Sequence, residues 1–266
     1  MSVIIVIPAR YASTRYPGKP LVQLTGATGV RKSLIRRSWD AALAVEGVDR
    51  VVVATDDIRI SDAATAFGAE VVMTSPTCAN GTERCAEAVD NLNGDYDIIV
   101  NLQGDAPLTP AWFISDLVAG LRANPQADVA TPVLRTEGRM LSALLQDRRE
   151  GRVGGTTAVF GADHNALYFS KEVIPFTGRS YDATDMTPVF HHVGVYAYRP
   201  AALRAYAGWP QGVLETLEGL EQLRFLERAV PMLCVEVAAQ GREFWELNNP
   251  EDVNRIEAML SAMGQE

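Results

Sequence analysis

Cationic and hydroxyl side chains gather in one segment near the start of the sequence. The segment 8–20 directly follows the apolar, mostly β-branched run 3–7, which is typical of a strand buried on both faces of a parallel sheet. Its polar side chains include those of Arg10, Ser13, Thr14, Arg15 and Lys19. Because open α/β sheets bind ligands beyond the carboxyl ends of their strands, we expect this loop to wrap a polyphosphate with backbone N–H groups and cations. The alternative is a solvated surface loop.

A second polar loop is predicted at the same edge of the sheet. The run 97–102 is a candidate buried strand and ends in Gln103-Gly104-Asp105. Further strands are expected over 51–54 and 70–73, and the helical spacing of apolar residues predicts helices over 33–45, 57–67 and 82–92. Alternating strands and helices predict a parallel sheet with right-handed crossovers, so the loops that follow its strands share one edge.

The pattern changes beyond residue 110. The expected elements are a helix over 110–121, a strand over 129–133, paired strands over 151–160 and 166–169, a strand over 193–198, a charged helix over 214–229, a strand over 235–237 and a closing helix over 250–263. The sequence has no internal repeat and no linker-like stretch. We therefore predict a single domain over 1–266 with a β-rich insertion at about 151–200.

Composition limits the classes of function. The chain has 266 residues, 47% of them hydrophobic, which is enough for a substantial core. The formal net charge of −9 argues against a general nucleic-acid or membrane-surface binder, so a phosphate site must be local. The 3 cysteines form no CxxC pair and predict reduced thiols in a cytoplasmic protein. No stretch has the length or flanks of a signal peptide or a membrane span, so we expect no membrane insertion.

Seven ordered motifs run through the sequence. They are IPARYASTRYPGKPL, VVVATDD, NGTERCAE, VNLQGDAPL, ALYFSKEVIPF, HHVGVYAYR and LETLEGLEQLRFLE. Together they resemble the CMP-Kdo synthetases, the 3-deoxy-manno-octulosonate (Kdo) cytidylyltransferases. The resemblance implies an α/β nucleotide-diphospho-sugar transferase fold, Rossmann-like with a mainly parallel sheet and a small β-rich lobe for dimerisation or substrate binding. It also implies a cytoplasmic homodimer, Mg²⁺ dependence, and a supply of activated Kdo for lipopolysaccharide or capsule.

The activity implied by the resemblance is transfer of CMP from CTP to the anomeric hydroxyl of a 3-deoxy sugar acid, with Kdo as the expected acid and pyrophosphate as the leaving group. Such a reaction requires two anions to be positioned and the developing charge to be neutralised. The catalytic positions match Arg10, Lys19 and Asp105, and Lys19 is expected to hold the leaving pyrophosphate. The nucleotide-binding positions match Pro8, Ala9, Arg10, Ser13, Lys19, Gly81, Thr82, Arg84 and Gln103.

The resemblance also assigns a metal site and an acceptor site. Asp105 matches the family's magnesium carboxylate, a hard oxygen ligand, and Asn248 falls where a second carboxylate is expected. The acceptor positions match His192, Tyr196, Glu221 and Gln222. Each assignment has a structural alternative. Asp105 taken alone is typical of a turn, Arg84 alone of a helix-surface ion pair with Glu83 or Glu87, and His192 alone of a buried core residue.

Three departures from the family pattern affect the metal and acceptor side. The family's QGDEP becomes QGDAP, which places Ala106 beside Asp105, and its VDTPEDL becomes LNNPEDV, which contains Asn248. An asparagine coordinates through a neutral carbonyl, so weaker Mg²⁺ binding is expected. The family's NPNxVKVV is replaced by VGGTTAVF, with Thr156 and Thr157 near the position of a lysine. The use of CTP is therefore better supported than the use of Kdo.

Other functions stay open at this point. One is a cytidylyltransferase for a different acid acceptor, such as an amino-Kdo, another ulosonic acid or a phosphonate. Another is a CTP-binding homologue without catalytic activity, which Ala106 and Asn248 motivate. A glycosyltransferase is disfavoured because those enzymes typically hold their metal with an Asp-x-Asp pair, whereas Gln103-Gly104-Asp105 offers one carboxylate.

Overall fold

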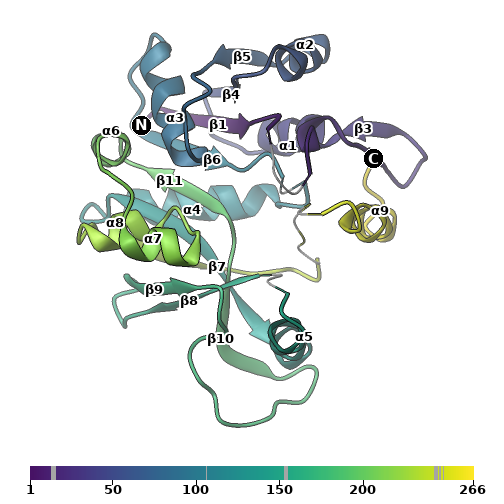
Figure 1. The fold of residues 1–266 in the computed structure, drawn as a ribbon, viewed down its shortest axis with the longest axis vertical. Coiled ribbons are helices and arrows are strands. Elements are labelled where there is room, and N and C mark those ends of the chain that lie inside the picture. The colour runs from purple at the N-terminus through teal and green to yellow at the C-terminus, as the bar shows by residue number, and fades with distance from the viewer. Residues whose placement is uncertain (13–15, 106, 153–154, 243–244, 246, 248) are drawn as a thin grey trace. The chain divides into compact units, whose positions relative to one another are not determined.

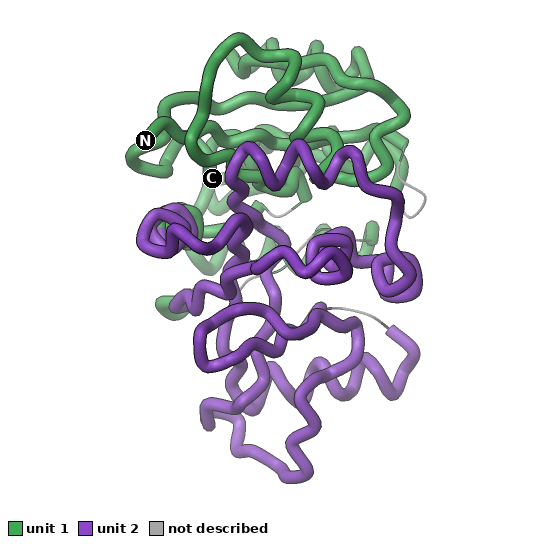
Figure 2. The backbone as a smooth tube through the Cα atoms, turned by 90° about the vertical axis from the view of Figure 1, so that its left-hand side faces the viewer, with its two compact units in different colours: residues 1–115, 239–266 green, residues 116–238 purple. Residues whose placement is uncertain are grey.

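The chain divides into two compact units in the computed structural model. Unit 1 comprises Met1–Ser115 and Ala239–Glu266, and unit 2 comprises Asp116–Ala238 (Figure 2). The structure describes residues 1–12, 16–105, 107–152, 155–242, 245, 247 and 249–266. Within these residues, no helix is long and apolar enough to cross a membrane. The predicted insertion at about 151–200 stays a prediction, and each unit is described by itself below.

Unit 1 contains a parallel sheet with strands in the order β5-β4-β1-β6 (Figure 1). Its strands are β1 (Val3–Ala9), β4 (Arg50–Thr55), β5 (Glu70–Met73) and β6 (Ile98–Leu102). All residues of β1 are buried, as its unbroken apolar run predicts for a strand with neighbours on both sides. β4 lies on one side of β1, and β6, which comes later in the chain, lies on the other side of β1. The point between β1 and β6 is therefore where the strand order reverses.

Helices connect the strands of unit 1. They are α1 (Leu34–Leu43), α2 (Ile58–Ala66) and α3 (Gly81–Asn91), and α9 (Asp252–Ala262) comes from the end of the chain. The helices α2 and α3 begin at side-chain caps, because Asp57 accepts from the Arg59 N–H and Asn80 accepts from the Glu83 N–H. These starts agree with the predicted helices over 57–67 and 82–92. The parallel α/β architecture is thus confirmed for unit 1.

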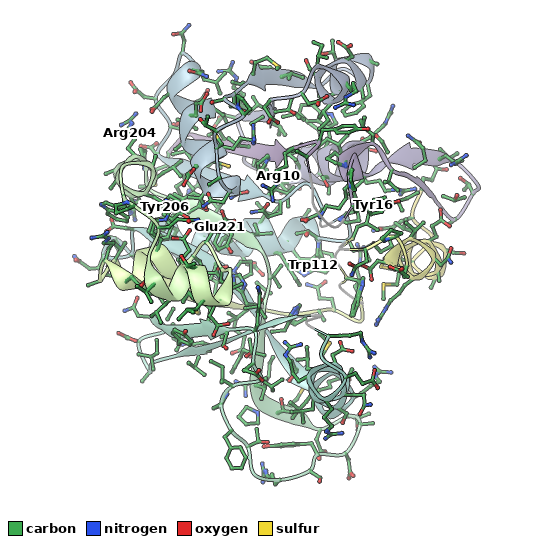
Figure 3. The ribbon with its side chains drawn as sticks, viewed as in Figure 1. Arg10, Tyr16, Trp112, Arg204, Tyr206 and Glu221 are labelled. Carbon is green, nitrogen blue, oxygen red and sulfur yellow. The ribbon has the colours of Figure 1, made fainter. Side chains whose placement is uncertain are left out.

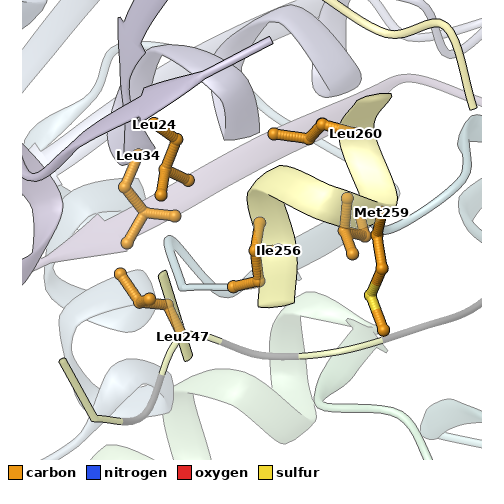
Figure 4. Packing of buried hydrophobic residues seen from close by; sticks show 7 residues of the cluster. Leu24, Leu34, Leu247, Ile256, Met259 and Leu260 are labelled. Atoms are coloured by element: carbon orange, nitrogen blue, oxygen red, sulfur yellow. The ribbon is translucent and has the colours of Figure 1, made fainter. Parts of the chain in front are cut away.

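A small hairpin and the last helix close one side of unit 1. The short elements here are η1 (Lys19–Leu21), β2 (Gln23–Thr25) and β3 (Arg31–Ser33), none of which was predicted. Apolar side chains from the hairpin region, α1 and α9 pack together in one cluster (Figure 4). Its buried members are Leu24, Leu34, Leu108, Leu247, Ile256, Met259 and Leu260. The two ends of the sequence therefore share one core.

Unit 2 is organised around the long strand β7 (Val129–Glu137). The other strands are β8 (Thr156–Phe160), β9 (Ala166–Ser170), β10 (Met186–His192), β11 (Val195–Tyr198) and β12 (Met232–Val237). β12 runs parallel to β7, whereas β10 and β11 run antiparallel to successive parts of it. β8 pairs with β10 and with β9, both antiparallel, which confirms the predicted pairing of 151–160 with 166–169.

The helices of unit 2 depart from the prediction. They are α5 (Gly138–Arg149), α6 (Pro200–Ala207), α7 (Val213–Glu218) and α8 (Leu223–Glu227), and α4 (Ala111–Ala123) contains the division between the units. The single helix predicted over 214–229 is wrong. Gly219 adopts a left-handed conformation with φ of 61°, which ends α7 and turns the chain before α8. Three of the five residues of the short α8 are buried, namely Leu223, Arg224 and Phe225.

Candidate functional site

A lysine and an aspartate meet beyond the ends of β1 and β6. These strands are parallel neighbours, with Val3 opposite Ile98 and Val6 opposite Asn101, so the loops that follow them start side by side. The Lys19 Nζ donates to the Asp105 Oδ2 at 2.6 Å. The two side chains are 15% and 29% exposed, so the ion pair is accessible from solvent. The pair lies at the reversal of strand order, which is where open α/β sheets bind ligands.

The loop before Lys19 is closed by its own backbone. The Gly18 N–H donates to the Tyr11 carbonyl at 2.9 Å, and the Lys19 N–H donates to the Tyr16 carbonyl at 3.2 Å. Figure 3 labels Arg10 and Tyr16, which come from the two sides of this loop. Arg10 is exposed. Ser13 lies outside the described residues.

The start of α3 lies against the residue that precedes Gly104. A Cβ added to Gly81 would come within 2.7 Å of the Gln103 Nε2, so the start of the helix lies close against the Gln103 side chain. Thr82 is buried beside it. Pro8 and Ala9 are the last residues of the central strand β1. The nucleotide positions described in unit 1 thus come from neighbouring strands and from one helix N-terminus, where the positive end of the helix dipole favours anions.

Arg84 is held inside unit 1. Its side chain is 3% exposed, and its Nη1 donates to the Thr74 Oγ1 at 2.5 Å and lies 3.5 Å from the Asp56 Oδ1. The alternative, an ion pair on the helix surface, is wrong, because the Arg84 side chain is buried and its ion pair is with Asp56. Burial and a nearby carboxylate fix a guanidinium in one orientation, so Arg84 is a rigid donor at the start of α3.

Asp105 is also tied to the C-terminal part of unit 1. Its carbonyl accepts from the Leu247 N–H at 3.0 Å, and Leu247 belongs to the cluster around α9. The described residues contain no group of three or more His, Cys, Asp or Glu side chains that could hold a metal ion. A single accessible carboxylate nevertheless fits Mg²⁺, which typically uses one or two carboxylates together with substrate phosphates and water. Ala106 and Asn248 lie outside the described residues.

In unit 2, His192 is a neutral, buried residue at the end of β10. Burial, and then the neighbouring His191, lower the pKa of His192 to about 3. Its Nε2 lies 2.9 Å from the Thr131 Oγ1, whose own hydroxyl donates to the Val195 carbonyl at 2.9 Å. Near neutral pH, His192 therefore carries no charge.

Tyr196 and Gln222 form a hydrogen-bonded pair in the interior of unit 2. The Tyr196 hydroxyl donates to the Gln222 Oε1 at 3.1 Å, and the ring of Tyr196 lies 5.6 Å from that of His192. Gln222 is 2% exposed. Its Nε2 has no hydrogen-bond partner among the described residues. A buried donor without a partner costs about 1–3 kcal/mol, so an oxygen of a ligand bound there would satisfy it.

The residues next to Gln222 are fixed by a buried ion pair. The Arg224 guanidinium donates to both carboxylate oxygens of Glu215 at 2.7 Å, and the two side chains are 1% and 4% exposed. The Tyr206 ring lies 4.1 Å from the guanidinium carbon, and the Tyr206 hydroxyl donates to the Glu221 carbonyl at 3.1 Å. Figure 3 labels Tyr206 and Glu221. This network holds the turn from α7 to α8 that carries Glu221 and Gln222.

The structure assembles the predicted residues within each unit. Lys19 meets Asp105 and Gly81 meets Gln103 in unit 1, whereas the acceptor positions all lie in unit 2. The prediction from sequence missed the supporting residues, namely Asp56, Thr74, Thr131, Tyr206, Glu215 and Arg224. A weak signal existed for Arg224, which stands between apolar residues in LRFL. The others carry no signal, because each meets its partner only once the chain has folded.

The comparisons with known proteins agree with this geometry. A family model described as "Cytidylyltransferase" matches residues 4–232. The 3-deoxy-manno-octulosonate cytidylyltransferase of Maricaulis maris is 45% identical over 265 residues, which cover 100% of this chain and 99% of that protein. The 8-amino-3,8-dideoxy-manno-octulosonate cytidylyltransferase of Shewanella frigidimarina is 40% identical over 264 residues, 98% of this chain and 99% of that protein.

A solved structure shares the fold across the whole chain. The structure of CMP:2-keto-3-deoxy-manno-octonic acid synthetase complexed with CTP is similar with a TM-score of 0.83 and 32% identity. The similarity covers 99% of this chain and 100% of that one. The predicted Rossmann-like nucleotidyltransferase fold is thereby confirmed.

Proposed function

The chain belongs to the cytidylyltransferase family, and on that premise we propose that it transfers CMP from CTP to the anomeric hydroxyl of Kdo. The anomeric oxygen attacks the α-phosphorus, the bond from that phosphorus to the bridging oxygen breaks, and pyrophosphate leaves. The hydroxyl proton is lost to solvent or a base. The observation that carries the proposal is the Lys19–Asp105 pair, 2.6 Å apart where β1 and β6 end, in a chain similar to Kdo cytidylyltransferases over its whole length.

Lys19 and Arg10 have the charge that the leaving group requires. Pyrophosphate departs with negative charge on its oxygens, and cations already in position stabilise that charge without reorganisation. Lys19 is expected to exchange part of its bond with Asp105 for phosphate oxygens, and the exposed Arg10 is free to approach the same phosphates. The base and ribose would contact the start of α3, where Gln103 and the rigid Arg84 lie.

We propose Mg²⁺ as the cofactor, with the Asp105 carboxylate as its protein ligand. When bound, the ion would neutralise charge on the phosphate oxygens. Asn248 is the proposed second ligand, through its neutral carbonyl. Asn248→Asp is expected to lower the Mg²⁺ concentration that supports half-maximal activity. The measurement is a Mg²⁺ titration of both proteins at saturating CTP, and equal titration curves would remove residue 248 from the metal site.

The acceptor would bind the polar residues of unit 2. The Gln222 Nε2 offers two N–H donors for a hydroxyl or carboxylate of the sugar acid, and Tyr196 fixes the orientation of that amide. Glu221 is expected to accept from a sugar hydroxyl. His192 contributes as a neutral side chain near Tyr196. An amino-Kdo is a second candidate acceptor, because the Shewanella frigidimarina relative named for that sugar is 40% identical.

The test is pyrophosphate release from CTP in the presence of Mg²⁺, with Kdo and with a panel of acids. The panel contains 8-amino-3,8-dideoxy-manno-octulosonate, a sialic acid and a phosphonate. We expect release with Kdo and formation of CMP-Kdo. Release only with another acid would move the assignment to that acceptor. No release with any acid, despite measurable CTP binding, would favour a non-catalytic homologue.

We also propose a cytoplasmic homodimer whose product is used for lipopolysaccharide or capsule. Unit 2 exposes several large apolar side chains that a partner copy could cover, and Phe176, Met186 and Leu167 are 94%, 56% and 67% exposed. Light scattering on the purified protein tests the dimer, and cell fractionation tests the compartment. A monomer at micromolar concentration would contradict the proposed assembly.

A further inference from the structure

An arginine–tyrosine stack lies at the base of the loop that carries Lys19. The guanidinium carbon of Arg59 is 3.3 Å from the centre of the Tyr11 ring. Asp57 accepts from the Arg59 Nε at 2.9 Å and from its Nη2 at 2.6 Å, and also caps α2 through the Arg59 N–H at 3.0 Å. Two parallel bonds to one carboxylate fix the plane of a guanidinium. The stack therefore rests on the first turn of α2.

Gly18 also lies against the Tyr11 ring. A Cβ added to Gly18 would lie 3.1 Å from the Cε2 and Cζ atoms of Tyr11, and the φ of +71° favours glycine at this position. The Gly18 N–H donates to the Tyr11 carbonyl at 2.9 Å. The ring thus contacts both Arg59 and Gly18. The contact between Gly18 and Tyr11 therefore fixes the backbone just before Lys19, the next residue.

We infer that Tyr11 and Arg59 are positioning residues that set Lys19 for the triphosphate of the nucleotide. The inference rests on the proposed function, because that function gives Lys19 its role. Contacts connect α2 to the site in sequence, from Asp57 to Arg59, Tyr11, Gly18 and Lys19, whose Nζ then meets Asp105 at 2.6 Å. Small displacements of a group that binds a reacting phosphate lower catalysis strongly, so the stack affects the reaction without touching the substrate.

Arg59 is neither a ligand of the phosphates nor a residue that folding requires. The Arg59 Nε and Nη2 both donate to the Asp57 carboxylate, so the charge of the guanidinium is already compensated. It is 56% exposed, and a surface cation–π contact contributes only about 0.5–1 kcal/mol to stability. Removing it is therefore expected to leave unfolding nearly unchanged while Lys19 loses its fixed position.

The first experiment compares Arg59→Ala with the wild-type protein in steady-state assays. We expect kcat/KM for CTP to fall about 3- to 10-fold, with the KM for the acceptor and the Tm unchanged. Tyr11→Ala should give the same effect, whereas Tyr11→Phe should behave as the wild type because it keeps the ring. The variant that combines Arg59→Ala with Tyr11→Ala should be no less active than either single variant. Arg36→Ala is the matched control, because its guanidinium carbon lies 5.5 Å from the centre of the Phe67 ring.

A second measurement requires no activity. Hydrogen exchange at the Gly18 and Lys19 amides is expected to accelerate in Arg59→Ala and in Tyr11→Ala, and not in Arg36→Ala. The inference is overturned if exchange at both amides in Arg59→Ala matches the wild type, or if its kcat/KM for CTP is unchanged in an active enzyme. Should the protein release no pyrophosphate with any acid, faster exchange together with weaker CTP binding in Arg59→Ala would still support the positioning role, and the proposed function alone would fail.

Discussion

The Lys19 Nζ lies 2.6 Å from the Asp105 Oδ2, although 86 positions separate the two residues in the chain. The parallel pairing of β1 with β6 brings their loops together. Neither side chain is fully buried, so each can also contact a ligand. An ion pair at this position keeps a cation and a carboxylate oriented before the nucleotide arrives.

Lys19→Ala and Asp105→Ala are each expected to lower kcat by at least about 100-fold, because each removes one preorganised charge that acts on the transition state. Single-turnover pyrophosphate release measures the loss. Lys32→Ala is the control, since the Lys32 Nζ also lies close to a carboxylate, 2.7 Å from the Asp40 Oδ2. Near-normal turnover in either site variant would remove that residue from the mechanism.

Tyr196→Phe is expected to raise the KM for the acceptor about 2- to 10-fold and to leave the KM for CTP unchanged, because one hydrogen bond to the Gln222 Oε1 is lost. The free amide can then rotate and present its oxygen instead of its N–H groups. Tyr168→Phe serves as the control, as the Tyr168 hydroxyl donates to the Glu218 Oε1 at 3.4 Å. An unchanged acceptor KM in Tyr196→Phe would show that the orientation of Gln222 does not affect acceptor binding.

Acid is expected to destabilise the protein through its two buried histidines. Burial lowers the pKa of His191 to about 4 and that of His192 to about 3, whereas an unfolded histidine titrates near 6.5. Below pH 6.5 the unfolded chain binds protons that the native state excludes, so the free energy of unfolding falls with pH. Each histidine contributes up to about 1.4 kcal/mol per pH unit, down to the native pKa.

Urea unfolding between pH 7 and pH 5 measures this slope. His192→Asn should make the slope shallower, whereas His164→Asn should leave it unchanged, because His164 is exposed and its φ of 61° is well tolerated by asparagine. If His192→Asn has the wild-type slope, His192 does not contribute to acid sensitivity.

Arg224→Met is expected to lower the free energy of unfolding by about 3–5 kcal/mol, because it leaves the Glu215 carboxylate buried without its partner. Arg135→Met, which removes an exposed pair with Glu236 at 3.0 Å, should cost less than about 1 kcal/mol. Denaturant unfolding of both variants compares the two sites. Equal losses would mean that burial does not determine the contribution of the Arg224 pair.

The prediction from sequence succeeded where the local pattern determines the structure. The apolar run 3–7 is the core of β1, and the strand predicted over 70–73 has the bounds of β5. Prediction failed where the structure depends on the backbone conformation of a single residue or on a contact between residues distant in the sequence. Gly219 divides the predicted helix over 214–229, and no local pattern distinguishes this glycine from one that a helix tolerates.

The site residues divide in the same way. Lys19 and Asp105 stand in the loops that follow buried strands, a position that is visible in the sequence. The buried partners of the site are not visible, because Thr131 reaches His192 across paired strands and Asp56 reaches Arg84 from a different connection. Thr157, one of the two threonines predicted near the position of the family's lysine, bonds within unit 2, as its hydroxyl donates to the Glu172 carbonyl and accepts from the Ile174 N–H.

The shared core of the two chain ends has a consequence for synthesis on the ribosome. Leu24 and Leu34 pack with Ile256 and Leu260, so the cluster that closes unit 1 needs residues from early and late in translation. Unit 2 is continuous, over Asp116–Ala238, and all of it leaves the exit tunnel before α9 does. Domains generally fold as units during synthesis. The apolar side chains of β2 and α1 therefore lack their α9 partners until α9 emerges from the ribosome. During that interval they are exposed to chaperones and to aggregation.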